Sequence, residues 1–180
     1  GYIFSGSYDD PNDLNVGFLI KTDDSGNLQW ETLFDGGYTE DVLEASNGGF
    51  VVVGGDTIIK TDDNGNYEWS SQISFQSTAI IQTSDGSYAV CGSIKEELSY
   101  LTKFDDNGNV MWNQSLPNNL NAYSPEVTDI KQTDDGGYIL TGILDNKAWL
   151  IKLSSFGYFE WEKTFNGFAY EESTSNSIDK

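Results

Sequence analysis

The feature that most constrains this chain is a ten-residue pattern that occurs four times. "KTDDSGNLQW" at 21–30 returns as "KTDDNGNYEW" at 60–69, "KFDDNGNVMW" at 103–112 and "KLSSFGYFEW" at 152–161. Every copy keeps the spacing K-x-x-x-x-G-x-x-x-W. Self-similarity at a period of tens of residues indicates a repeat architecture, in which one supersecondary unit is used several times. The pattern therefore builds the fold, because a site that is used once would not be copied four times.

Short strand-like segments surround every copy of the pattern. They are rich in β-branched and aromatic residues and are bounded by Asp, Asn and Gly, as strands are. Each repeat should hold a moderately apolar first strand, a second strand that starts with an aromatic residue and ends in glycine, a third that ends near the lysine, and a fourth that carries the tryptophan. The sequences "DDSG" and "DDNG" between the third and fourth strands predict a type I turn with glycine in the left-handed conformation. The second strands are predicted at 2–6, 50–54, 88–92 and 138–142, and the first strands at 41–46, 79–84, 127–133 and 175–180.

Four-stranded units that repeat every roughly 40–50 residues are the blades of a β-propeller. We therefore predict an all-β fold with four visible blades in one domain, 1–180. The chain begins on a second strand and ends on a first strand. We expect that C-terminal strand to pair with the N-terminal blade, which would close the ring and leave no open edge. Alternatively, the four blades are half of a larger propeller or a portion of a longer array. The repeats are approximately 1–38 plus 172–180, 39–75, 76–123 and 124–171.

The repeated residues resemble two known kinds of blade. K-x-D-x-x-G-x-x-x-W is similar to the blade repeat of secreted bacterial and archaeal propellers. It also resembles the tryptophan-docking motif of quinoprotein-like (PQQ-like) propellers, in which an Asp, a Gly and a Trp recur near the turn between the third and fourth strands. Kelch repeats, which also pair glycines with a later Trp, are a second candidate family. The matching positions are Asp23, Gly26, Trp30; Asp62, Gly65, Trp69; and Asp105, Gly108, Trp112, while the last repeat keeps Gly157 and Trp161 but has Ser154 in place of Asp.

Composition excludes several classes of function. The chain has 29 acidic residues, nine lysines and no arginine, and its formal net charge is −20. Such a field repels nucleic acid and anionic membranes, and phosphate-backbone binding would need clustered cations. Histidine is absent, so a Ser-His-Asp or Cys-His site cannot form. No apolar run is long enough to insert into a membrane, and the single Cys91, which cannot form an intrachain disulfide, is expected to be a small buried residue.

The acidic turns are candidate cation sites. "DDNGN" partly resembles the start of a Ca²⁺ loop, although it lacks the loop's spacing and its bidentate acid at the twelfth position. Hairpin turns of this composition need no metal. We therefore expect structural turns and no cofactor, with Ca²⁺ binding as the alternative. The residues concerned are Asp23, Asp24, Asp62, Asp63, Asp105 and Asp106.

The repeated lysines and tryptophans are expected to be structural. In a strand, Lys21 and Asp23 would point to the same face, and the same holds in the next two copies, so ion pairs or stems packed on Trp are predicted. The tryptophans should pack between blades, with the second-strand glycines allowing close approach of a ring or backbone from the next sheet. The set comprises Lys21, Trp30, Lys60, Trp69, Lys103, Trp112, Lys152 and Trp161.

Function is expected in the longer loops. The connections between second and third strands, and from each fourth strand to the next blade, fall on one face and vary in length, and variable loops on a rigid scaffold usually carry function. Their aromatic and acidic residues suit glycan or protein binding; alternatively, the aromatics cap the ends of the blades. The candidate ligand-binding residues are Tyr8, Asp10, Asp13, Tyr38, Tyr123, Phe168 and Tyr170.

The preferred hypothesis is a non-catalytic extracellular module that binds, adheres or serves a structural role through this long-loop face. One alternative is a subunit or repeating segment of an extracellular filament or surface layer, with self-association. The other is an enzyme, either part of a quinoprotein-like oxidoreductase or a glycosidase that uses two loop carboxylates. The resemblance to secreted propellers, the missing initiator Met and the sequon at 113–115 lead us to expect an extracellular or cell-surface location. The loop acids to test for catalysis are Asp10, Asp13, Glu40, Glu126 and Glu171.

Overall fold

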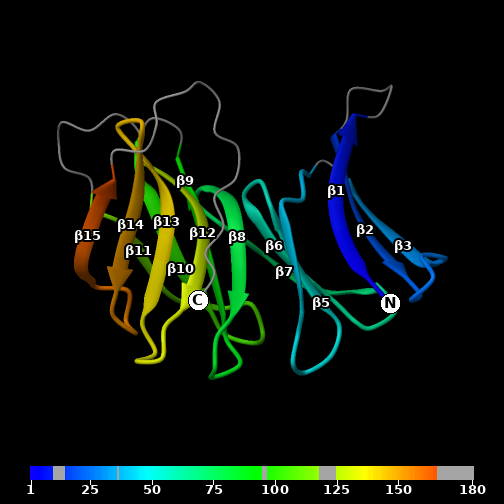
Figure 1. Cartoon of the computed structure of the whole chain (residues 1–180). Coiled ribbons are helices and arrows are strands. Elements are labelled where there is room, and N and C mark those ends of the chain that lie inside the picture. The colour runs from blue at the N-terminus through cyan, green and yellow to red at the C-terminus, as the bar shows by residue number, and fades with distance from the viewer. Residues whose placement is uncertain (10–14, 36, 95–96, 118–124, 166–180) are drawn as a thin grey trace. The chain divides into compact units, whose positions relative to one another are not determined.

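The computed structural model describes residues 1–9, 15–35, 37–94, 97–117 and 125–165. These residues form strands and turns with no helix, so they contain no helical segment that could cross a membrane. The chain divides into two compact units, Gly1–Ser77 and Thr78–Lys180, and each unit holds two antiparallel sheets (Figure 1). The predicted all-β architecture of blade-like sheets is therefore confirmed.

The first unit holds one sheet of three described strands and one of four. Strands of each sheet are neighbours in chain order, as in a β-meander, so the two sheets repeat one topology. The predicted strand that would complete the first sheet, at 175–180, lies outside the described residues. The sheets are β1 (Ile3–Asp9), β2 (Asn15–Thr22) and β3 (Leu28–Asp35), then β4 (Asp41–Glu44), β5 (Phe50–Gly54), β6 (Thr57–Thr61) and β7 (Tyr67–Gln72).

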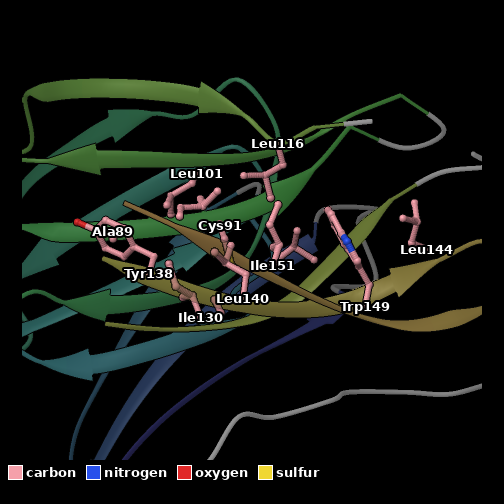
Figure 2. Packing of buried hydrophobic residues seen from close by; sticks show 13 residues of the cluster. Ala89, Cys91, Leu101, Leu116, Ile130, Tyr138, Leu140, Leu144, Trp149 and Ile151 are labelled. Atoms are coloured by element: carbon pink, nitrogen blue, oxygen red, sulfur yellow. The ribbon is translucent and has the colours of Figure 1, made fainter. Parts of the chain in front are cut away.

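The second unit repeats this topology with two four-stranded sheets. Between the strands of these sheets lies a hydrophobic cluster that includes Cys91 and Leu101 from one sheet and Tyr138, Leu140 and Ile151 from the other (Figure 2). Cys91 is fully buried there, as predicted. The strands are β8 (Gln76–Gln82), β9 (Tyr88–Ser93), β10 (Ser99–Phe104) and β11 (Val110–Ser115), then β12 (Glu126–Gln132), β13 (Tyr138–Leu144), β14 (Lys147–Leu153) and β15 (Phe159–Phe165).

The turn between third and fourth strands has the same geometry in all four sheets. The glycines at 26, 65, 108 and 157 have φ between 77° and 80°, a left-handed conformation in which other residues are strained. Each third strand also has a register shift just after its lysine, for example between Lys60 and Thr61 and between Lys103 and Phe104. Such a β-bulge changes the direction of the side chains that follow it.

The glycines of the second strands do allow close approach, but from their own sheet or from the segment that leads into it. A Cβ at Gly54 would overlap the carbonyl oxygen of Tyr38, and one at Gly142 would overlap that of Glu126. At Gly6 the approaching group is the ring of Phe18 on the paired strand. The expectation that the next sheet supplies the contact is therefore wrong at these three positions.

Candidate functional site

Three of the repeated lysines are buried at the ends of their third strands. Lys60 is 2% exposed, and Lys103 and Lys152 are 7% exposed. A buried ammonium needs a partner, and each has at least one. Lys103 pairs with Asp85 at 2.6 Å, and Lys152 pairs with Asp135 at 3.0 Å and with Glu160 at 3.2 Å. Lys60 donates to the carbonyl oxygen of Gly48 and lies 3.3 Å from Glu68; Lys21 donates to the carbonyl oxygen of Thr22.

Asp85 and Asp135, the aspartate partners of Lys103 and Lys152, come from the turn between the first and second strands. Strand alternation had instead suggested Asp105, in the turn after the third strand. Asp85 also accepts hydrogen bonds from Thr83 and from the backbone of Ser87. Burial alone would raise the pKa of Asp85, but the hydrogen bonds from Lys103, Thr83 and Ser87 together outweigh burial and hold that pKa well below its usual value. The carboxylate therefore stays ionised beside the buried lysine.

In the second sheet, the carboxylate that accepts from the backbone of the first turn comes from a different turn. Its first turn has Asn47 at the position of Asp85, so the turn supplies no carboxylate. Asp63, from the turn between the third and fourth strands, instead accepts a hydrogen bond of 2.6 Å from the backbone nitrogen of Gly49. Asp24 occupies the same position in the first sheet and accepts one of 2.6 Å from the nitrogen of Gly1.

The remaining acids of the turns after the third strands are engaged by the turns themselves. Asp23 accepts from the backbone nitrogens of Ser25 and Asn27 and from the Asn27 side chain. These hydrogen bonds, that of the Asn27 side chain first, lower the pKa of Asp23. Asp62 and Asp105 repeat the arrangement with Asn66 and Asn109, while Asp106 accepts from the side chain of Asn107.

Metal binding at these turns stays a prediction. In the part of the chain that the structure describes, no three acidic or cysteine side chains gather as the ligands of one ion. A Ca²⁺ ion would have to compete for carboxylate oxygens that already accept hydrogen bonds from their own turns.

Two tryptophans show how neighbouring sheets of a unit are joined. Trp30 donates to the carbonyl oxygen of Asp63 at 3.2 Å and packs on Phe50, with ring centroids 5.6 Å apart. A Cβ at Gly65 would lie 2.7 Å from the Trp30 ring. Close contact between tryptophan and the turn thus requires glycine.

The joint in the second unit is built the same way. Trp112 lies against Gly157, where a Cβ would be 2.8 Å from its ring, and meets Tyr138 edge-on with centroids 5.8 Å apart. Tyr138 is fully buried; burial raises its pKa, and the nearby Lys103 of the preceding sheet opposes part of that rise. Trp69 is half-buried, whereas Trp161 is 40% exposed.

Two residues of the predicted ligand-binding face lie in the described part of the chain. Tyr8, near the end of β1, is 46% exposed, and Tyr38, which precedes β4, is 48% exposed. The backbone beside Tyr38 is fixed, because the Thr39 hydroxyl donates to the carbonyl oxygens of Gly6 and Phe18. The other predicted members lie outside the described residues: Asp10, Asp13, Tyr123, Phe168 and Tyr170.

The acids considered for glycoside hydrolysis are only partly described. Glu40 and Glu126 are exposed, and they belong to different units. Asp10, Asp13 and Glu171 lie outside the described residues. The described chain therefore gives no separation between two converging carboxylates, which is the quantity that would indicate a glycosidase.

Sequence reasoning missed an aromatic strip on β1. Tyr2 is 65% exposed, Phe4 and Tyr8 are each 46% exposed, and their even numbering places them on one face of the strand. The Phe18 ring lies over Gly6 and meets Phe4 edge-on at 6.2 Å and Tyr8 at 6.5 Å. The signal was present in "YIFSGSY", in which aromatic residues stand at alternate positions and Gly6 lies midway between Phe4 and Tyr8.

Comparison with known proteins identifies the fold. No family model matches the sequence, and no curated protein does. The structure is similar to a protein of unknown function from Bacteroides caccae, with a TM-score of 0.60 and 11% identity over 91% of this chain and 68% of that one. It is also similar to the WD40 domain of Neurospora crassa Pan2, with a TM-score of 0.58 and 15% identity over 91% of this chain and 50% of that one. This chain has the β-propeller fold.

A third similar structure is BamB from Moraxella catarrhalis, with a TM-score of 0.56 and 13% identity over 89% of this chain and 50% of that one. The propeller identified here thus spans half the length of the Pan2 and BamB structures. Sequence identities this low show the fold alone. The activities and partners of these proteins therefore do not carry over to this propeller.

Proposed function

We propose that this propeller is a non-catalytic binding module, exported to the cell surface or beyond, that takes a glycan through Tyr8 and Tyr38. The observation that supports the proposal is the half-exposed state of both tyrosines at the long-loop end of the first unit. Tyrosine presents an apolar ring and a polar hydroxyl with little side-chain entropy to lose. Tyrosine is among the residues enriched at binding interfaces relative to the rest of the surface.

Electrostatics favour a ligand without negative charge. The net charge of −20 repels anionic partners. A neutral or amino-bearing glycan meets no such electrostatic barrier. Neighbouring Asp side chains can accept hydrogen bonds from its hydroxyl groups, and neighbouring Asn side chains can both donate and accept. A basic protein is the other ligand that the same surface would accept.

Export is proposed from the sequence. The K-x-D-x-x-G-x-x-x-W pattern resembles the repeats of secreted bacterial and archaeal propellers and of quinoprotein-like propellers. A non-catalytic role is proposed because the chain has no histidine or arginine, the residues that most often serve acid–base catalysis and bind anionic cofactors.

The test is a glycan array followed by calorimetry on the strongest hit. Tyr8→Ala and Tyr38→Ala should each weaken binding by about tenfold or more, as loss of an aromatic anchor does. Tyr67→Ala is the matched control, since Tyr67 is 64% exposed on β7 of the same unit. Equal affinity in all three variants, or turnover of a glycan that Glu40→Gln or Glu126→Gln abolishes, would contradict the proposal.

A further inference from the structure

The fourth strand of the third sheet differs from its three counterparts in charge. In that sheet β11 is an edge strand, and among the described strands it pairs with β10 alone. The equivalent strands carry charged side chains, such as Glu31 on β3, Glu68 on β7 and Glu162 on β15. The sequence of β11, "VMWNQS", contains no charged residue, and its first two side chains, Val110 and Met111, are 54% and 53% exposed.

An uncharged and partly apolar edge strand is a site of unwanted association. Its outward N–H and C=O groups are a template for pairing with another strand, which proteins prevent with charged side chains, prolines or bulges on the edge. β11 contains no proline, and the bulge after Lys103 is shared by all four sheets, so it does not replace the missing charge. A protecting group of another kind is therefore expected on β11.

β11 also carries the one N-glycosylation acceptor motif of the sequence, Asn113-Gln114-Ser115. Alternate residues of a strand share a face, so Asn113 and Ser115 lie on the same side of β11, and both are exposed. Gln114 points the other way, towards the fourth sheet, where its Cγ would lie 2.9 Å from a Cβ at Gly157. The amide that would be modified and the hydroxyl that the motif requires are therefore presented together.

The position of Asn113 is accessible even in a sheet that has another sheet packed on that side. Its counterpart Ser70 lies on the side of the second sheet that packs on the first sheet through Phe50, and Ser70 is nevertheless exposed. Its counterpart Glu162 pairs with Ile151 of the cluster between the third and fourth sheets and is only half-buried. A joint between sheets thus leaves this position of the fourth strand open to a bulky group.

We propose that Asn113 is N-glycosylated and that its glycan protects the edge of the third sheet. The inference rests on the export proposed above, because this motif is modified in secreted proteins. In the transfer, the carboxamide nitrogen of Asn113 attacks the anomeric carbon of an oligosaccharide carried on a polyprenyl diphosphate. The N–C bond forms as the bond from that carbon to the diphosphate oxygen breaks. The polyprenyl diphosphate leaves, and the amide nitrogen loses one proton.

The glycan would do on β11 what a carboxylate does on the equivalent strands. An N-glycan is bulky and solubilising, so at Asn113 it keeps a second strand away from the outward backbone groups of β11. It also shields the exposed Met111, which lies on the same face of the strand. Glu31 and Glu162 occupy the same position of the repeat as Asn113, so charge and glycan are two solutions at one site.

Mass spectrometry of protein isolated from its native cells tests the modification. Trypsin cleaves after Lys103 and Lys131 and releases the peptide 104–131, which contains the whole motif. This peptide should be heavier than its sequence by one oligosaccharide, and peptide N-glycosidase should remove the added mass and convert Asn113 to aspartate. An unmodified peptide from protein outside the cell would overturn this inference while leaving the exported binding module intact. An unmodified peptide from protein that stays inside the cell would overturn both proposals.

Light scattering of the whole chain, secreted from a host that adds N-glycans, tests the protective role. Asn113→Gln and Ser115→Ala each remove the glycan and should lose solubility, whereas Ser115→Thr keeps the motif and should behave as wild type. Because the two glycan-free variants change different side chains, a folding defect in one of them, seen by circular dichroism, leaves the other as the test.

A charge at the same position should replace the glycan. Asn113→Glu supplies the side chain of Glu31 and Glu162 and should stay soluble without any glycan. Asn107→Gln, which changes an exposed asparagine outside the motif, is the matched control and should leave both the glycan and the solubility unchanged. Equal solubility of wild type, Asn113→Gln and Ser115→Ala, or aggregation of Asn113→Glu as fast as that of Asn113→Gln, would overturn the protective role.

Discussion

At the scale of single residues, the buried lysines impose the strictest requirement on the sequence. Asp85→Asn should lower the free energy of unfolding at pH 7 by about 2 kcal/mol, because Lys103 would stay buried without its carboxylate. The loss is smaller than for a fully buried pair, since the Asp85 side chain is 54% exposed and partly screened by water. Urea denaturation measures this difference, and Asp106→Asn, in the neighbouring turn, is the matched control.

The same pair predicts a pH dependence. The folded-state pKa of Asp85 lies below the unfolded value of 3.8, so its contribution to stability is complete above that value and is lost as the pH falls towards the folded pKa. The stability difference between wild type and Asp85→Asn should therefore be constant from pH 7 to about 4 and should narrow only below that. A difference that already disappears near neutral pH would show that another group is responsible.

A compensation between two turns can be tested in the second sheet. Asp63→Ala should cost about 1 kcal/mol, because the Gly49 nitrogen loses its acceptor. Adding Asn47→Asp should restore part of that loss, since an aspartate there can accept from Gly49 as Asp135 accepts from Gly137. Recovery stays partial because Ala45 lacks the hydroxyl with which Thr133 supports Asp135. If Asn47→Asp stabilises wild type and the Asp63→Ala variant equally, the two turns do not compensate.

At the scale of elements, the joint between sheets depends on a glycine for two separate reasons. Gly157→Ala should destabilise by about 3 kcal/mol, from the left-handed backbone and from overlap with the Trp112 ring. Gly86→Ala has the same backbone conformation but open space around it, and it should cost only about 1 kcal/mol. Thermal unfolding of the two variants isolates the packing contribution; equal losses would show that the tryptophan yields without cost.

The strands and turns could be predicted from the repeat, but the partners of the lysines could not be predicted from strand alternation. Alternation placed Lys103 and Asp105 on one face, yet the β-bulge after Lys103 breaks the alternation before Asp105 is reached. A better signal was available: Asp85 and Asp135 occupy the same position in two first turns, and both sheets carry the buried lysine. Comparing repeats position by position would have found this pair.

At the scale of the whole molecule, the sequence revealed the repeat but not which copies of it are covered. Tyr2 and Tyr138 occupy the same position in two repeats, but Tyr138 is fully buried against Trp112 of the neighbouring sheet of its unit, whereas Tyr2 belongs to the first sheet of its unit and is 65% exposed. Stability in repeat folds is approximately a sum of unit and neighbour contributions, so the joint between two sheets contributes separately from the sheets themselves. The burial of a repeated residue therefore depends on its neighbouring sheet and cannot be predicted from a single repeat.

Net charge is a property of the whole chain, and it predicts how salt acts on stability. With a formal charge of −20, the folded state is destabilised by self-repulsion, so NaCl should raise the melting temperature. CaCl2 and MgCl2 at equal concentration should raise it further and equally, because the acids of the turns are already engaged by hydrogen bonds from Asn27, Asn66 and Asn109. Calorimetric scans in the three salts measure this. A larger increase with Ca²⁺ than with Mg²⁺, abolished by Asp62→Asn, would instead establish a calcium site at the turns.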